Sequence, residues 1–179
     1  MKYIACFGDS LIQGFPYMNE SSWIAEVENR TNIKMLNYGV CGECCDDIYY
    51  RLRMTMLPEA TKHILFLGGA NDIIQGRPQK CILEDIAKLL KWCEQKNYKL
   101  CIVLPLISAE PVLNKYLVAL GEKIKEQFAE KALLLDLQPA IGLTDDERDE
   151  AYLDGVHPKA ITYKLMGVHA APILEAWVK

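Results

Sequence analysis

Short apolar segments alternate with longer amphipathic segments along the whole chain. The apolar segments have the length of strands, end at polar or glycine-containing turns, and occupy residues 2–7, 33–38, 63–67, 99–104 and 132–135. Nearly continuous apolar runs are typical of strands that are buried on both faces, as in parallel sheets, whereas half-exposed strands alternate. The pattern therefore predicts a sheet of five buried parallel strands.

The segments between these runs carry apolar residues at the three- and four-residue spacing of a helix face. Helices are expected to begin near Ser21, Cys44 to Asp46, Pro78, Glu110 and Pro158. The helix after Cys44 is expected to bury Ile48, Leu52 and Met56 and to end before Pro58. Because a crossover between parallel strands needs about a helix's length of chain, this order predicts a three-layer α/β/α sandwich of the flavodoxin-like type.

Composition restricts the possible partners. The chain has 179 residues, 51% hydrophobic and 25% charged, with no proline- or glycine-rich linker, so one domain over residues 1–179 is expected. A formal net charge of −4, with scattered Lys and Arg, argues against nucleic acid. No apolar run approaches the roughly 20 residues that span a bilayer, and the apolar start is too short for a signal peptide. We therefore expect a cytoplasmic protein without membrane association; its oligomeric state is not predicted.

A serine follows the first predicted strand directly, in the sequence Gly8-Asp9-Ser10-Leu11. In open α/β sheets reactive groups collect at the carboxyl ends of strands. A serine after a strand can also cap a helix, so its role depends on context. Gly8 and Gly14 flank the serine and leave room for a substrate, and the sequence is neither a G-x-S-x-G elbow nor a phosphate loop. Ser10 is the candidate nucleophile.

A base for this serine must come from only three histidines. His63 begins a predicted buried strand and His169 lies within the last helix, whereas His157 lies in a loop beside a glycine and a proline. Asp154, three residues upstream, can accept a hydrogen bond from one ring nitrogen and so direct the other toward Ser10. We expect His157 to act as the base and Asp154 to orient it.

Attack on an ester creates an oxyanion, which hydrogen-bond donors must stabilise. Gly42 can offer a backbone N–H at the start of a predicted helix, and Asn71, after the third strand, can offer a side-chain amide. Seen alone, these residues would be a turn glycine and an Asx turn. This chemistry requires no metal ion, and no cofactor is expected.

The seven cysteines suggest an alternative hypothesis for the function. Three of them, in predicted strands or on an apolar helix face, are expected to be reduced core thiols: Cys6, Cys93 and Cys101. The cluster Cys41-Gly42-Glu43-Cys44-Cys45 contains a C-x-x-C pair where a strand gives way to a helix. A helix N-terminus would lower a thiol pKa, so a thiol–disulfide oxidoreductase that uses Cys41 and Cys44 is the rival hypothesis. Zinc is disfavoured because no second close Cys/His pair follows.

Four blocks in order carry a family resemblance: Gly8-Asp9-Ser10-Leu11, Asn37-x-Gly39-x-x-Gly42, Gly69-Ala70-Asn71-Asp72 and Asp154-x-x-His157-Pro158. Together they resemble the SGNH hydrolases, also called GDSL-type esterases and lipases. The resemblance implies Ser10 as nucleophile, His157 as base oriented by Asp154, and an oxyanion hole made by the Ser10 and Gly42 N–H groups and the Asn71 side chain. Lys159 and Thr162 depart from the family pattern, as do the cysteines of the second block.

The predicted function is hydrolysis of a small-molecule carboxylic ester through an acyl-enzyme on Ser10. The short chain leaves little room for a lid, so short acyl or acetyl esters are expected, including acetyl groups on sugars. A thioesterase or a lysophospholipase-type acyl hydrolase of the same family is an alternative. A catalytically inactive binding module is disfavoured because no catalytic block is broken.

Overall fold

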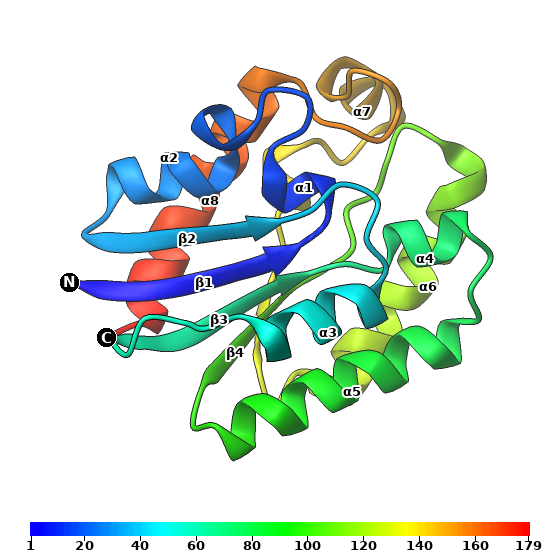
Figure 1. Cartoon of the computed structure of the whole chain (residues 1–179). Helices are drawn as coiled ribbons and strands as arrows, with labels where there is room; N and C mark the ends of the chain where they lie inside the picture. The colour runs from blue at the N-terminus through cyan, green and yellow to red at the C-terminus, as the bar shows by residue number, and fades with distance from the viewer.

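The computed structural model describes all residues from 1 to 179 and has three layers, with a parallel sheet between two layers of helices (Figure 1). The strands are β1 (Lys2–Gly8), β2 (Ile33–Gly39), β3 (Thr61–Leu67), β4 (Lys99–Val103) and β5 (Leu133–Leu135). They form one five-stranded sheet in the order β2-β1-β3-β4-β5, and every pair is parallel. The predicted α/β/α architecture is confirmed.

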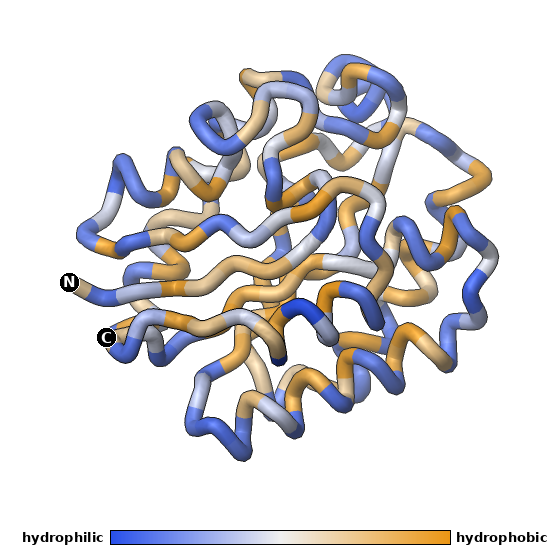
Figure 2. Tube along the Cα trace, in the orientation of Figure 1, coloured by the Kyte–Doolittle hydropathy of each residue, from blue (hydrophilic) through white to orange (hydrophobic).

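Helices cover both faces of this sheet. They are α1 (Ser10–Gln13), α2 (Trp23–Arg30), α3 (Cys45–Met54), α4 (Ala70–Ile74), α5 (Gln79–Gln95), α6 (Pro111–Phe128), α7 (Asp145–Ala151) and α8 (Ala160–Trp177), with 3₁₀ turns η1 (Asn19–Ser21) and η2 (Gln138–Ala140). Helices α2 and α8 pack on one face, and α3, α5 and α6 pack on the other. Hydropathy along the trace follows this arrangement, because apolar stretches run through the sheet and polar ones along the outer turns of the helices (Figure 2).

Strand β1 shows why its sequence is apolar without alternation. Ile4 and Cys6 belong to a cluster of 24 buried residues on the α2 and α8 face. Ala5 and Phe7 belong to a cluster of 18 buried residues on the opposite face. All four side chains are fully buried, so both faces of the strand need apolar residues.

Local structure departs from the sequence-based expectations in a few places. Helix α3 ends at Met54, so the prediction that Met56 belongs to its buried face was wrong, and Met56 is 95% exposed. The final helix begins at Ala160 rather than Pro158. Helices α1, α4 and α7 were not predicted, because four to seven residues are too few to reveal a helical period.

No helix in the protein combines the length and the apolar character that a bilayer crossing requires. The cytoplasmic location stays a prediction.

His63 lies near the amino end of β3, at the edge of the sheet away from Ser10, and only 8% of it is exposed. Its ring packs edge-on against Trp177, with centroids 4.6 Å apart, and its Nε2 atom has no hydrogen-bond partner. Burial, and next the positive charges of Lys99 and Lys2, lower the pKa of His63 from 6.5 to about 4. The ring is therefore neutral in the folded protein at neutral pH.

This shift predicts that His63 makes folding less favourable in acid. Between pH 6.5 and about 4 the unfolded chain binds a proton on His63 that the folded protein does not, so the free energy of unfolding falls as the pH drops through this window. We expect His63→Leu to remove that contribution. The check is the difference in urea midpoint between wild type and variant at pH 7.5 and pH 5. The account is wrong if the difference in urea midpoint between the two proteins is the same at pH 7.5 and at pH 5.

Candidate active site

The carboxyl edge of the sheet gathers side chains from three distant parts of the sequence. Ser10 is the first residue of α1, directly after β1, and Asn71 lies in α4, which follows β3. Asp154 and His157 lie in the loop between α7 and α8. All four residues line one pocket of about 150 Å³. The parallel topology places these groups together, because the carboxyl ends of all its strands share one edge.

A continuous chain of hydrogen bonds joins three of these side chains. The Ser10 Oγ atom lies 3.0 Å from Nε2 of His157, and Nδ1 of His157 lies 2.7 Å from Oδ2 of Asp154. The other carboxylate oxygen of Asp154 accepts the backbone N–H of His157 at 2.8 Å and that of Val156 at 3.1 Å. This is the arrangement that activates a serine hydroxyl in Ser-His-Asp hydrolases.

Two opposing influences act on the Asp154 carboxyl group. Desolvation is the largest and would raise its pKa, but hydrogen bonds from the backbone and ring of His157 and from the Val156 N–H together outweigh it. The pKa of Asp154 is therefore below its ordinary value. A carboxylate that stays ionised at neutral pH can stabilise a positively charged imidazole ring.

The imidazole ring also has contacts outside this chain of hydrogen bonds. The Phe15 ring packs against it with centroids 4.7 Å apart, and the buried Tyr163 hydroxyl donates to the Phe15 carbonyl at 3.0 Å. The backbone of the loop is held as well, because the carbonyl of His157 accepts the N–H of Leu153 at 2.8 Å. These contacts restrict the ring to the orientation that faces Ser10.

Helix α1, which carries Ser10, is fixed by residues of two other elements. The Trp23 indole N–H donates to the Leu11 carbonyl at 3.0 Å, and the Asn37 amide donates to the Ile12 carbonyl at 2.7 Å. A β-carbon on Gly39 would lie 2.1 Å from a backbone nitrogen of α1, so only glycine allows this approach. Asn37 and Gly39, both from the second sequence block, therefore fix the position of the helix that carries Ser10. The sequence analysis missed this role.

The loop that carries Gly42 is held at two points. The Val40 N–H donates to the carbonyl of Gly8 at 2.9 Å, and the Asn71 side-chain nitrogen donates to the carbonyl of Glu43 at 3.0 Å. Gly42 lies between these points with φ +83°, in the left-handed region that favours glycine.

The expectation that Gly42 lies at a helix start was wrong. Helix α3 begins at Cys45, with Cys44 as its N-cap, so the Gly42 N–H belongs to a turn before the helix. The cap lies there because the Asp47 carboxylate accepts the Cys44 N–H at 3.2 Å. A donor in this turn gains little from the helix dipole, whose effect is confined to the first turn of the helix.

Asp9 is a buried carboxyl group beside the serine, and the sequence analysis gave it no role. Its Oδ1 atom accepts the Leu11 N–H at 2.9 Å, which caps α1, and its Oδ2 atom lies 3.5 Å from the amide nitrogen of Asn71. Burial, which is the largest cause, raises the pKa of Asp9 to about 7. Asp9 is thus partly protonated near neutral pH, which limits the negative charge next to Ser10.

The cysteine cluster does not have the properties of a redox pair. Cys41 is exposed, whereas Cys44 and Cys45 are buried, and all three are free thiols. Burial, and next the negative charge of Asp72, raise the pKa of Cys44 to about 11. The thiol is therefore less reactive than a free cysteine, opposite to the lowered pKa that a thiol–disulfide oxidoreductase needs.

Arg77, which follows α4, forms ion pairs with carboxylates of three helices, α3, α4 and α5. It forms an ion pair with Asp72, whose side chain is fully buried, and further pairs with Asp85 at 2.9 Å and the exposed Asp46 at 3.0 Å. Asp72 also accepts the backbone N–H of Cys45 at 3.0 Å. The guanidinium group therefore supplies positive charge to all three carboxylates, of which Asp85 also pairs with Lys88 at 2.8 Å, and it connects α4 to the start of α3.

Removal of this cation should destabilise the protein strongly. We expect Arg77→Met to lower the free energy of unfolding by about 3 kcal/mol, because it leaves a fully buried carboxylate without its charge partner. Lys80→Met is the matched control, since Lys80 is 86% exposed and its pair with Glu84 spans 3.7 Å. That variant should change the stability by less than about 0.5 kcal/mol. Equal effects of the two variants in urea unfolding would contradict this reading.

Comparisons with known proteins identify the family of the chain. The sequence model of the GDSL-like lipase/acylhydrolase family matches residues 6–165. No curated protein sequence matches the chain.

Several solved structures share the fold over almost the whole chain. A G-D-S-L family protein from Desulfitobacterium hafniense is 24% identical, with a TM-score of 0.88, and the match covers 97% of this chain and 99% of that one. A G-D-S-L family member from Veillonella parvula is 23% identical, with a TM-score of 0.83 and coverage of 97% and 98%. The psychrotrophic esterase EstA from Pseudoalteromonas sp. is 19% identical, with a TM-score of 0.80 and coverage of 99% of both chains. By the family match over residues 6–165, the chain belongs to the GDSL-like lipase/acylhydrolase family of ester hydrolases.

Proposed function

We propose that this protein hydrolyses carboxylic esters through an acyl-enzyme on Ser10, with His157 as general base and Asp154 as the group that orients it. The observation that carries the proposal is the unbroken contact chain of 3.0 Å between Ser10 and His157 and 2.7 Å between His157 and Asp154. We also propose that residues 1–179 act as one hydrolase domain, since the site draws on residues from position 10 to position 157.

In the first half-reaction, Nε2 of His157 removes the proton from Ser10 as its oxygen attacks the carbonyl carbon of the ester. The tetrahedral intermediate then collapses, and the imidazolium ring gives this proton to the departing alcohol. In the second half-reaction a water molecule loses a proton to His157 and attacks the acyl-enzyme. Collapse of the second intermediate releases the acid and returns the proton to Ser10.

The oxyanion of each intermediate is proposed to lie among the N–H groups of Ser10 and Gly42 and the side-chain amide of Asn71. The Asn71 nitrogen carries two hydrogens, and the Glu43 carbonyl at 3.0 Å takes one of them. The other hydrogen has a long contact with Asp9, whose Oδ2 atom lies 3.5 Å from the Asn71 nitrogen, and we propose that it donates to the oxyanion in place of this contact. Donors fixed in advance in this way cost no reorganisation when the charge develops.

The same steps would serve an oxygen ester or a thioester, because only the leaving group differs. Fold neighbours include the esterase EstA and a carbohydrate acetylesterase family member from Sinorhizobium meliloti, so they support an ester in general and do not select an acyl group. The thioesterase and lysophospholipase-type alternatives are therefore retained. The raised pKa of Cys44 gives no support to the thiol oxidoreductase hypothesis.

We expect Ser10→Ala to abolish hydrolysis of p-nitrophenyl acetate, and Asn71→Ala to lower kcat by about 10²- to 10³-fold, the usual cost of one oxyanion donor. The exposed Ser21 provides the control, and Ser21→Ala should retain the wild-type rate. EstA has been described in a form inhibited by monoethylphosphonate, so an organophosphonate is a suitable probe of the nucleophile. Mass spectrometry should find its adduct on Ser10. Wild-type rates in both Ser10→Ala and Asn71→Ala would refute the mechanism.

A further inference from the structure

Arg51, on helix α3, uses its guanidinium group to join three separate segments near the candidate active site. Its Nε atom donates to the Glu43 carboxylate at 2.8 Å, and one terminal nitrogen donates to the Tyr38 carbonyl at 2.7 Å. The other terminal nitrogen donates both to Glu43 and, at 3.3 Å, to the Gly8 carbonyl. Four of the five N–H groups of the side chain therefore have acceptors.

Two of these acceptors lie at the carboxyl ends of strands. Gly8 is the last residue of β1, two positions before Ser10, and Tyr38 is the next to last residue of β2. The Gly8 carbonyl also accepts the Val40 N–H at 2.9 Å. The end of β1, the loop after β2 and the guanidinium group of Arg51 therefore meet at one carbonyl oxygen.

The ion pair between Arg51 and Glu43 is largely shielded from water. Their side chains are only 23% and 17% exposed, and the guanidinium carbon lies 5.3 Å from the centroid of the buried Phe7 ring. An exposed pair of long side chains is mobile and contributes little, whereas a shielded pair with several hydrogen bonds keeps one geometry. Glu43 is therefore held in place relative to the ends of β1 and β2.

The backbone of Glu43 connects this ion pair to the proposed oxyanion hole, because its carbonyl accepts the Asn71 amide at 3.0 Å. An asparagine side chain can turn by 180° about its last bond, which exchanges the positions of its nitrogen and its oxygen. The Glu43 carbonyl can accept a hydrogen bond only from the nitrogen. Its position therefore selects the orientation in which Asn71 presents a donor, and not its own carbonyl oxygen, to the substrate.

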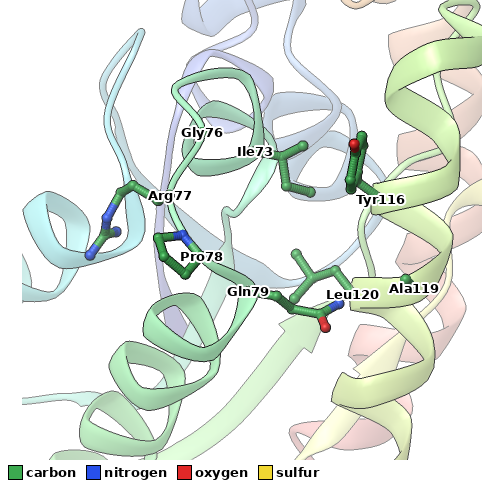
Figure 3. A pocket seen from close by; sticks show the side chains of 8 residues that line it. All are labelled: Ile73, Gly76, Arg77, Pro78, Gln79, Tyr116, Ala119 and Leu120. Carbon is green, nitrogen blue, oxygen red and sulfur yellow. The ribbon is translucent and has the colours of Figure 1, made fainter.

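The other arginine with several buried contacts, Arg77, does not duplicate this role. Its side chain points away from Tyr116 in Figure 3, toward the carboxylates with which it forms ion pairs. None of these carboxylates is hydrogen-bonded to the Asn71 amide, which has the Glu43 carbonyl as its short-distance acceptor. The contacts that reach the Asn71 side chain therefore come from Arg51 by way of Glu43.

We infer that Arg51 is a positioning residue for the proposed reaction: its ion pair fixes Glu43, and the Glu43 carbonyl sets the orientation of the Asn71 amide. The inference rests on the proposed function. Arg51 does not line the pocket that contains Ser10, so it acts through Glu43 and not on the substrate. The ion pair has no net charge, and its effect lies in the placement of a donor. A lysine would keep the charge without the planar fork that reaches several acceptors at once.

Steady-state kinetics with p-nitrophenyl acetate provide the first test. Arg51→Met should lower kcat about tenfold with a smaller change in KM, because a loosened oxyanion donor acts in the transition state and costs less than a removed one. Arg51→Lys should restore part of kcat. Arg53→Met is the matched control, since Arg53 lies on the same helix and is exposed, and it should retain the wild-type kcat.

Two double-mutant cycles test the order in which these residues act. In the Asn71→Ala background, Arg51→Met should have little further effect on kcat, because the donor that it positions is already absent. Glu43→Met should lower kcat to a similar extent as Arg51→Met, and the variant that carries both changes should be no slower than either one. These results are expected only if the three residues act in one chain of contacts.

A readout without turnover is the NMR signal of the Asn71 side-chain amide, which is assigned by its loss in Asn71→Ala. The signal should shift in Arg51→Met and not in Arg53→Met. Urea unfolding of the same variants shows whether each of them is folded under the assay conditions. If Arg51→Met does not fold, Arg51→Lys and Glu43→Gln serve for the same comparisons, because each keeps a polar group in the place of one partner.

The outcomes separate this inference from the proposed function. Multiplicative effects of Arg51→Met and Asn71→Ala on kcat would overturn the positioning role while leaving the esterase proposal intact. So would an unchanged amide signal in Arg51→Met, or a loss of stability in that variant with a wild-type kcat. Absence of any Ser10-dependent hydrolysis would instead refute the proposed function, and the amide signal alone would then decide whether Arg51 orients Asn71.

Discussion

Backbone pairing of β1 with strands on both sides determines where the chemistry can occur. Gly8 pairs with Gly39 of β2 and with Leu67 of β3, so the three strands end at the same level. The chain leaves each strand at this edge and passes directly into the segments that carry Ser10, Gly42 and Asn71. Hydrogen bonds between parallel strands therefore bring together groups that are as many as 61 residues apart, before any side chain contributes.

Charge at this edge is balanced by different means for two buried carboxyl groups. Asp9, next to the serine, has its pKa raised by burial to about 7, and so carries less than a full charge near neutrality. Asp72 is paired with Arg77 and accepts the Cys45 N–H. Both arrangements limit uncompensated negative charge where an oxyanion would form, and both also fix loops of the site. Asp9 and Asp72 therefore each have both an electrostatic and a structural role.

The supporting residues form a second layer around the proposed triad. Phe15 and Tyr163 hold the imidazole ring, Asn37 and Trp23 hold α1, and Arg51 holds the Glu43 loop. Few of these contacts involve residues close in sequence. Through this layer, the groups of the proposed site are held by the body of the protein.

The sequence by itself determined the layered parallel sheet, because strands buried on both faces need continuous apolar runs and crossovers between them need helices. It also identified Ser10 and Asn71 as polar groups that follow strands, and Asp154 and His157 as a pair in a loop, since His157 alone among the histidines lies in a loop. The roles of these residues stay predictions. Tertiary structure alone decided the positions of Asp9, Arg51 and Arg77, and the turn that holds Gly42. These features arise from contacts between residues far apart in the chain, and the periodicity of a single segment carries no information about its partners.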